Sequence, residues 1–230
     1  MEDKRLSRRG FLNTVSTGVA AVGLSTFATS SLADAKPGSV AAPDTNAADA
    51  WFNQIKGKHR IAYDVVEPNG PMPFVWPRVF LMTNEETGTP AKDCNVVVIL
   101  RHEAMPFAVG DAIWEKYKVG EMLKVDDPRT GKPATRNPFW KPGPKDFVFP
   151  AVGPVQIGIN QLQESGVMFC VCHMALKVNT AALAAKLKAD PDEMLKEWTD
   201  AVLPGIQIVP SGVWAVGRAQ EHDCAYCYAG

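Results

Sequence analysis

Two cysteines and a histidine stand together in the stretch GVMFCVCHMAL at residues 166–176, where a hydrophobic run ends and a helical pattern begins. At such a junction the helix N-terminus and a neighbouring imidazolium favour the thiolate form of a cysteine. A thiolate can attack a sulfane sulfur and hold it as a persulfide. Cys172, supported by His173, is therefore the first candidate for nucleophilic chemistry. The alternative, that Cys172 is a buried core thiol, is the interpretation that we prefer for Cys170.

A second group of potential ligands lies in the carboxy-terminal stretch EHDCAYCYAG. His222, Cys224 and Cys227, together with the Cys172 region, offer the thiolate and imidazole ligands that suit zinc or copper. A single C-x-x-C pair is a weak signal, and a structural or redox-active disulfide between Cys224 and Cys227 is the alternative. The remaining cysteine, Cys94, is interpreted as a buried bystander. With five cysteines, at least one thiol stays unpaired within the chain.

His102 follows the apolar run NVVVILR and is the third candidate for the site. Arg101 and Glu103 flank it, either to orient the imidazole or to form an ordinary surface ion pair. The chain has neither a G-x-S-x-G nor a G-x-x-x-x-G-K-[ST] motif, so serine-nucleophile and phosphate-loop chemistry are not indicated.

The elements that must position these side chains form an alternating pattern. Apolar, mostly β-branched runs near residues 60–66, 95–100, 167–171 and 206–209 predict strands that are buried on both faces. Helical patterns separate them, which indicates a three-layer α/β/α sandwich with a mainly parallel sheet. Because ligands of such sheets bind outside the carboxyl ends of the strands, His102 and Cys172 are expected on one functional edge.

The predicted helices fix where the carboxy-terminus goes. A helix at 173–189 is followed by Asp190-Pro191, which supply an N-cap and a first helical residue for the next helix. A last helix at 211–222 runs back toward the amino ends of the strands. Cys224 and Cys227 are therefore expected far from Cys172 in the same chain, as a local disulfide or a site shared with a neighbouring subunit. Other helical patterns cover 74–88, 108–123 and part of 154–166.

The rest of the chain divides into three segments. Residues 1–35 contain Arg8-Arg9 in an SRRGFL context, then a weakly apolar stretch and Ala33-Asp34-Ala35, and resemble a twin-arginine export signal. Residues 36–58 are expected to form a linker or arm, and residues 59–230 one domain. Seven of the 18 prolines lie in an insertion at 128–154, whose aromatic residues favour an ordered flap.

These features place the mature protein in the periplasm, without stable insertion in a membrane. The export stretch is interrupted by Ser, Thr and Gly, whereas a membrane span needs about 20 apolar residues. The net formal charge of −1 gives no reason to expect nucleic acid as a partner. Zinc or copper remains a potential cofactor, because both metals bind the thiolate and imidazole ligands described above.

The order of elements resembles the DsrE/DsrF-like domain of sulfur-relay proteins. The resemblance rests on GVMFCVCHMAL followed by a helix, on PGIQIVPSGVWAVGRAQEHDCAYCYAG, and on RIAYDVVE and NVVVILRHEAMPFAVGD as the first two strands. It covers about residues 60–230 apart from the insertion. The family's cysteine maps on Cys172, or on Cys170 if the alignment slips by two.

The resemblance implies a three-layer α/β/α sandwich, which is usually oligomeric in this family and in some members carries sulfur as a cysteine persulfide. We therefore expect an exported protein that handles sulfane sulfur or thiols through Cys172, with His173 and His102 in support. It would be a sulfurtransferase or a sulfur carrier, and its partners would be a sulfur donor or acceptor protein or a small thiol. The alternative is a periplasmic metal- or small-ligand-binding protein without turnover.

Overall fold

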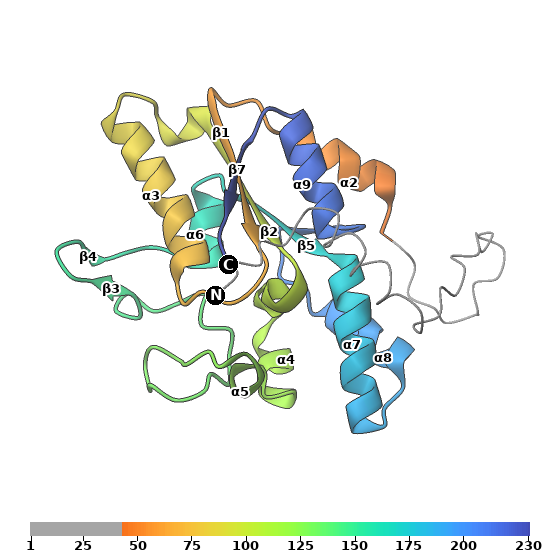
Figure 1. Ribbon diagram of the computed structural model, residues 1–230. Coiled ribbons are helices and arrows are strands. Elements are labelled where there is room, and N and C mark those ends of the chain that lie inside the picture. The colour runs from red at the N-terminus through yellow and green to blue at the C-terminus, as the bar shows by residue number, and fades with distance from the viewer. Residues whose placement is uncertain (1–42) are drawn as a thin grey trace, which may run out of the picture. The chain divides into compact units, whose positions relative to one another are not determined.

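The computed structural model describes residues 43–230, in which five strands form one parallel sheet (Figure 1). The strand order is β6-β5-β2-β1-β7, and all four neighbouring pairs are parallel. The strands are β1 (His59–Val65), β2 (Cys94–Leu100), β5 (Met168–Cys172), β6 (Ile206–Val209) and β7 (Ala225–Tyr228). The four strands expected from the apolar runs are therefore confirmed as neighbours in one sheet.

Helices cover both faces of this sheet, which confirms the three-layer α/β/α architecture. Figure 1 shows α3 on one side of the sheet and α2 and α9 on the other. The α3 face is the larger and also carries the helices that lie between β2 and β6 in the sequence. These are η2 (His102–Ala108), α4 (Asp111–Lys116), α5 (Val119–Leu123), α6 (Ile159–Glu164), α7 (His173–Leu187) and α8 (Pro191–Asp200), in addition to α3 (Met72–Glu86).

The alternation of side chains along the strands explains why the apolar runs have no polar face. In β2, Val96, Val98 and Leu100 pack in the larger core, whereas Val97 and Ile99 pack in the smaller core beneath α2 (Thr45–Phe52) and α9 (Gly212–Glu221). Both sets are almost completely buried. A strand with a layer of helices on each face must be apolar throughout.

The start of α8 and the break between α4 and α5 each depend on a particular residue. The Asp190 carboxylate accepts hydrogen bonds from the backbone N–H groups of Asp192 and Glu193, as the expected N-cap of α8. The helix expected at 108–123 is instead divided into α4 and α5, because Lys118 adopts a left-handed conformation at φ 52°. A Cβ on the following Gly120 would lie 2.3 Å from backbone atoms of Ala134, so the close approach of the insertion requires glycine at this position.

The proline-rich insertion is an ordered flap on the larger core. It contains the short hairpin β3 (Val148–Phe149) and β4 (Gly153–Pro154). Phe139 is buried and stacks on Phe74 of α3 with the ring centroids 4.1 Å apart. Ion pairs from Arg136 to Asp127 and from Arg129 to Asp146 close its loops. Packing and charge pairing together hold a segment that has almost no regular structure.

Strand β7 is the element that the sequence did not predict. No strand was expected after the last helix, yet Ala225–Tyr228 pair in parallel with β1. The stretch is short and lies at the sheet edge, with Tyr226 and Tyr228 about half exposed, so it lacks the continuous apolar run of a central strand. The chain therefore returns to the carboxyl edge of the sheet.

The segment expected as a linker or arm, residues 36–58, is described from residue 43 onward. There it forms α2, whose Ala48 and Phe52 are fully buried in the smaller core. This part is an arm packed on the sheet and not a free linker. The proposed export signal at 1–35 lies outside the described residues. Among residues 43–230 there is no helix with the length and apolar character needed to cross a membrane.

Candidate functional site

The two helices that follow β5 and β6 leave the sheet toward opposite faces. Helix α7 packs in the larger core, whereas α9 packs in the smaller one. Their N-termini therefore lie at the carboxyl ends of two neighbouring strands, and the backbone N–H of Met174 donates to the carbonyl of Pro210 at 3.3 Å. In open parallel sheets, such a point of divergence is where ligands bind.

Cys172 lies at this point. It ends β5 and is the N-cap of α7, and its Sγ accepts a hydrogen bond from the backbone N–H of Ala175 at 3.2 Å. The side chain is 6 % exposed. The sulfur therefore lies at a helix N-terminus, where the backbone N–H groups attract negatively charged groups. His102 follows β2, the neighbour of β5, so His102 and Cys172 lie on the same edge of the sheet.

A buried carboxylate lies on β1, the strand that pairs with β2 on the side away from β5. Asp64 is 2 % exposed and receives two parallel hydrogen bonds from Arg101, from Nε to Oδ1 at 2.6 Å and from Nη2 to Oδ2 at 2.9 Å. A third bond comes from the Tyr226 hydroxyl of β7, which donates to Oδ2 at 2.9 Å. We call Asp64, Arg101 and Tyr226 the carboxylate network. It joins the ends of β1, β2 and β7.

The charges of the carboxylate network extend to Cys172. The hydrogen bond to Asp64 raises the pKa of Arg101, and the charge of the Asp64 carboxylate favours the cation further. Burial and the bond to Asp64 raise the pKa of Tyr226, so its hydroxyl keeps the proton that it donates. The register Leu100↔Val171 places Arg101 and Cys172 one residue beyond the last paired positions of β2 and β5. The residue that carries this permanent cation is therefore the strand neighbour of the candidate nucleophile, and its guanidinium lies within electrostatic reach of Cys172.

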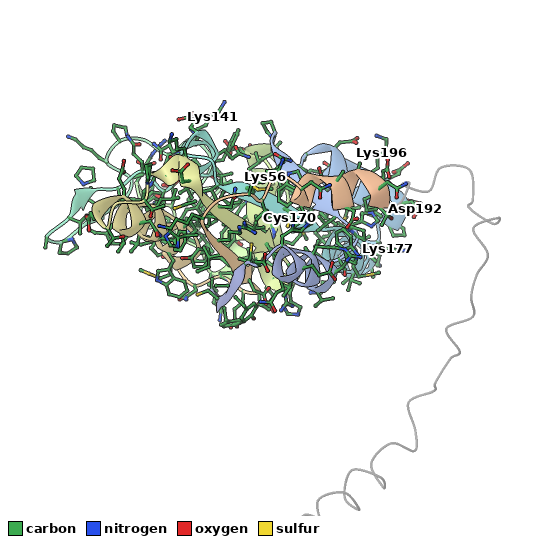
Figure 2. All side chains as sticks on the ribbon, turned by 90° about the horizontal axis from the view of Figure 1, so that it is seen from above. Lys56, Lys141, Cys170, Lys177, Asp192 and Lys196 are labelled. Carbon is green, nitrogen blue, oxygen red and sulfur yellow. The ribbon has the colours of Figure 1, made fainter. Side chains whose placement is uncertain are left out.

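The other four thiols lie in surroundings that disfavour ionisation. Burial raises the pKa values of Cys94, Cys170 and Cys227, and it raises that of Cys224 to about 11. Figure 2 shows Cys170 in the interior of the domain, whereas Lys141 and Lys196 lie at its periphery. The core assignment of Cys170 agrees with its full burial. These four thiols are protonated at neutral pH and are poor nucleophiles.

The two histidines expected near Cys172 differ in their surroundings. His173 lines a pocket together with Thr199 of α8 and residues 206–208 of β6, and its buried Nε2 has no hydrogen-bond partner among residues 43–230. Burial and the nearby Lys177 lower its pKa, so the ring is neutral at neutral pH. His102 is exposed at φ 50°, and its carbonyl accepts a bond from Asn179. Arg101 thus supplies a positive charge within electrostatic reach of Cys172, whereas the His173 ring does not.

The burial of His173 gives a testable dependence of stability on pH. Because the pKa of His173 is lower in the folded than in the unfolded chain, its contribution is complete above about pH 6.5 and is lost as the pH falls through the folded value. We expect the free energy of unfolding to fall below that pH by more in the wild type than in His173→Gln. Urea titrations between pH 5 and 8 measure this. Equal slopes for the wild type and His173→Gln would contradict the assignment.

The carboxy-terminal pair does not form one site. Cys224 packs in the smaller core, whereas Cys227 packs against the larger core beside Tyr63, so β7 directs the two sulfurs to opposite faces of the sheet. All five cysteines are free. The expected local disulfide between Cys224 and Cys227 is therefore wrong, because two residues on opposite faces of a strand cannot be bridged.

The candidate metal ligands are separated in the same way. The ring of His222 stacks with that of Phe52, at a centroid distance of 6.4 Å, on the α2 face of the sheet. Within residues 43–230, no group of three or more His, Cys, Asp or Glu side chains is arranged to hold a metal ion. The zinc or copper site built from His222, Cys224 and Cys227 is thus not formed within the chain.

Sequence reasoning missed two members of the carboxylate network. Asp64 was one charge inside the strand pattern RIAYDVVE, and a charge buried within a strand is rare unless it is paired. That signal pointed to a partner without identifying it. Tyr226 was missed because its strand was missed. Arg101 was noted only as a neighbour of His102, although its side chain reaches Asp64 in β1.

Comparison with known proteins adds little to this geometry. No family model and no curated protein matches the chain. A solved structure of a protein of unknown function from Methanobacterium thermoautotrophicum, MTH1491, is similar at 14% sequence identity with a TM-score of 0.40. The match covers 74% of this chain and 99% of that one.

Proposed function

We propose that this protein is a DsrE/DsrF-like sulfur-handling protein that carries sulfane sulfur as a persulfide on Cys172. The observation that supports this best is the setting of the Cys172 sulfur, which accepts the Ala175 N–H at a helix start and lies within electrostatic reach of the Arg101 cation. The resemblance of GVMFCVCHMAL, and of the order of elements along the sequence, to that family points the same way. Sulfur would reach Cys172 from a donor protein or a small thiol and leave to an acceptor of the same kind.

The chemistry requires one nucleophilic step. The Cys172 thiolate attacks the outer sulfur of a persulfide R–S–SH, a new S–S bond forms, and the old S–S bond breaks with its electron pair leaving on RS⁻. The product is Cys172–S–SH. The backbone N–H of Ala175 and the guanidinium of Arg101 suit the negative charge that sulfur carries before and after the step.

The test is the mass of the native protein after incubation with inorganic polysulfide. We expect the wild type to gain one sulfur atom on the peptide that contains Cys172 and to lose it again on reduction. Cys172→Ser should gain none. Cys94→Ser is the matched control, because Cys94 is as buried as Cys172 but lies at the start of β2, and it should behave as the wild type does. A sulfur adduct that persists in Cys172→Ser would reject the proposal.

A pocket beneath the flap supports a second candidate function, the binding of a small ligand without turnover. It has a volume of about 450 Å³, and its walls include Phe139, Phe147 and several prolines. Neither Cys172 nor Arg101 lines it. A protein of this kind would bind an apolar compound equally well in the wild type and in Cys172→Ser, which calorimetry distinguishes from sulfur transfer.

Export through the twin-arginine pathway is part of the proposal. Arg8-Arg9 and the weakly apolar stretch that follows support it. We expect replacement of both arginines by lysine to retain the precursor in the cytoplasm, because the receptor recognises the arginine pair. Fractionation of cells that express the full chain measures this, and normal export of the double variant would contradict it.

A further inference from the structure

The Arg101 guanidinium keeps hydrogen-bond donors that the fold does not use. Of its five N–H groups, Asp64 occupies one on Nε and one on Nη2. Within residues 43–230 the side chain makes no other hydrogen bond that meets ordinary geometry, so the Nη1 group and one Nη2 hydrogen are free to donate. The side chain is 25 % exposed, so part of it is accessible to a small molecule.

Two further contacts prevent Arg101 from moving. Gly212, the first residue of α9, lies so close that a Cβ there would come within 2.6 Å of both Cβ and Cδ of Arg101. On the other side, Asp64 is held by the Tyr226 hydroxyl as well as by Arg101 itself. The glycine admits the arginine stem, and the carboxylate fixes its planar head in a two-point bond. The free donors therefore have a fixed direction.

From this geometry we infer that Arg101 selects anionic substrates for Cys172, and that Asp64 and Tyr226 are positioning residues that hold Arg101 for this purpose. The inference rests on the proposed function. The substrate class is a small persulfide whose R group carries a carboxylate, which Arg101 binds while Cys172 attacks the outer sulfur. A neutral persulfide of the same size gains nothing from Arg101.

The experiment uses two alkylating probes that differ in charge, iodoacetate and iodoacetamide. Cys172 displaces iodide from either one, so the reaction does not depend on sulfur chemistry. The rate is measured for the Cys172 peptide by mass spectrometry in full-length protein, and the readout is the rate with iodoacetate divided by the rate with iodoacetamide. Dividing the rates cancels any change in the reactivity or accessibility of the thiol itself.

We expect Arg101→Met to lower this ratio about tenfold, the value of one hydrogen bond to a charged group. Arg101→Lys should lower it less, because the charge is retained and the planar fork is lost. Asp64→Asn should lower it although Arg101 is still present, because the neutral amide no longer fixes the guanidinium through two charge-assisted bonds. Lys196→Gln on the exposed face of α8 removes the same charge from the protein and should leave the ratio unchanged.

Tyr226→Phe is the mildest variant and keeps the test valid if Asp64→Asn does not fold. Loss of the hydroxyl should reduce the ratio by less than Arg101→Met does, and salt should reduce the wild-type ratio toward that of Arg101→Met. A ratio that is the same in wild type, Arg101→Lys and Arg101→Met overturns the inference. If the ratio changes as expected but no sulfur adduct forms with polysulfide, the anion selectivity stands and the proposed function fails.

Discussion

Phe74→Ala is expected to lower the free energy of unfolding by about 3–5 kcal/mol, the usual cost of removing a fully buried phenylalanine side chain. Phe74 lies at the centre of an aromatic cluster. Its ring stacks on Phe139 of the flap at 4.1 Å and meets Phe107 of η2 edge to face at 5.5 Å. Alanine would leave a cavity between α3, η2 and the flap, because the Phe74 ring fills the space between these three segments.

Urea denaturation followed by circular dichroism measures this loss as a shift of the midpoint at constant slope. Val79→Ala in the same helix is the control, since Val79 is 48% exposed and its truncation should change the free energy of unfolding little. Because Phe139 loses its stacking partner, cleavage by protease within the flap should also become faster in Phe74→Ala. A loss similar to that of Val79→Ala would show that the flap is not held by this cluster.

Asp64→Ala is expected to cost about 3 kcal/mol, because it leaves the Arg101 cation without its buried partner. This is near the lower end of the usual cost of breaking a buried ion pair, since the Arg101 side chain is 25 % exposed and water can solvate part of it. The double variant Asp64→Ala/Arg101→Met should recover most of the loss, because no uncompensated charge remains. Chemical denaturation of both variants measures the difference.

The control for this prediction is an ion pair at the surface. Lys196 and Asp200 in α8 form a pair with side chains 67% and 63% exposed, and Asp200→Ala should cost less than about 1 kcal/mol. If Asp64→Ala costs no more than Asp200→Ala, the carboxylate network contributes nothing to stability. If the double variant is as unstable as the single one, the loss comes from packing and not from the unpaired charge.

The sequence by itself determined the sheet and its helical layers. Strands such as NVVVIL are apolar on both faces, and this pattern is compatible with little other than a parallel sheet between two layers. Once that is known, the rule that ligands bind at carboxyl ends places Cys172 and His102 on one edge without coordinates. The N-cap at Asp190 could also be predicted from the sequence, because its carboxylate accepts hydrogen bonds from N–H groups only two and three residues away.

The tertiary structure alone decided which polar groups meet at the carboxyl edge of the sheet. Asp64, Arg101 and Tyr226 are widely separated in the chain, and only the pairing of β7 with β1 and of β1 with β2 brings them together. β7 could not be read from CAYCY, because an edge strand of four residues gains its stability from the partner strand and not from its own pattern.

The same pairing overturned the local interpretation of the cysteines. Spacing in the sequence placed Cys224 and Cys227 close together, but the alternation of side chains across β7 sends them to opposite faces. Likewise, His173 is adjacent to Cys172 in the chain, yet its ring packs beside β6 and α8, where burial keeps it neutral. Neighbouring positions in a sequence fix the distance along the backbone, whereas the direction of each side chain and the charges around it are set by packing.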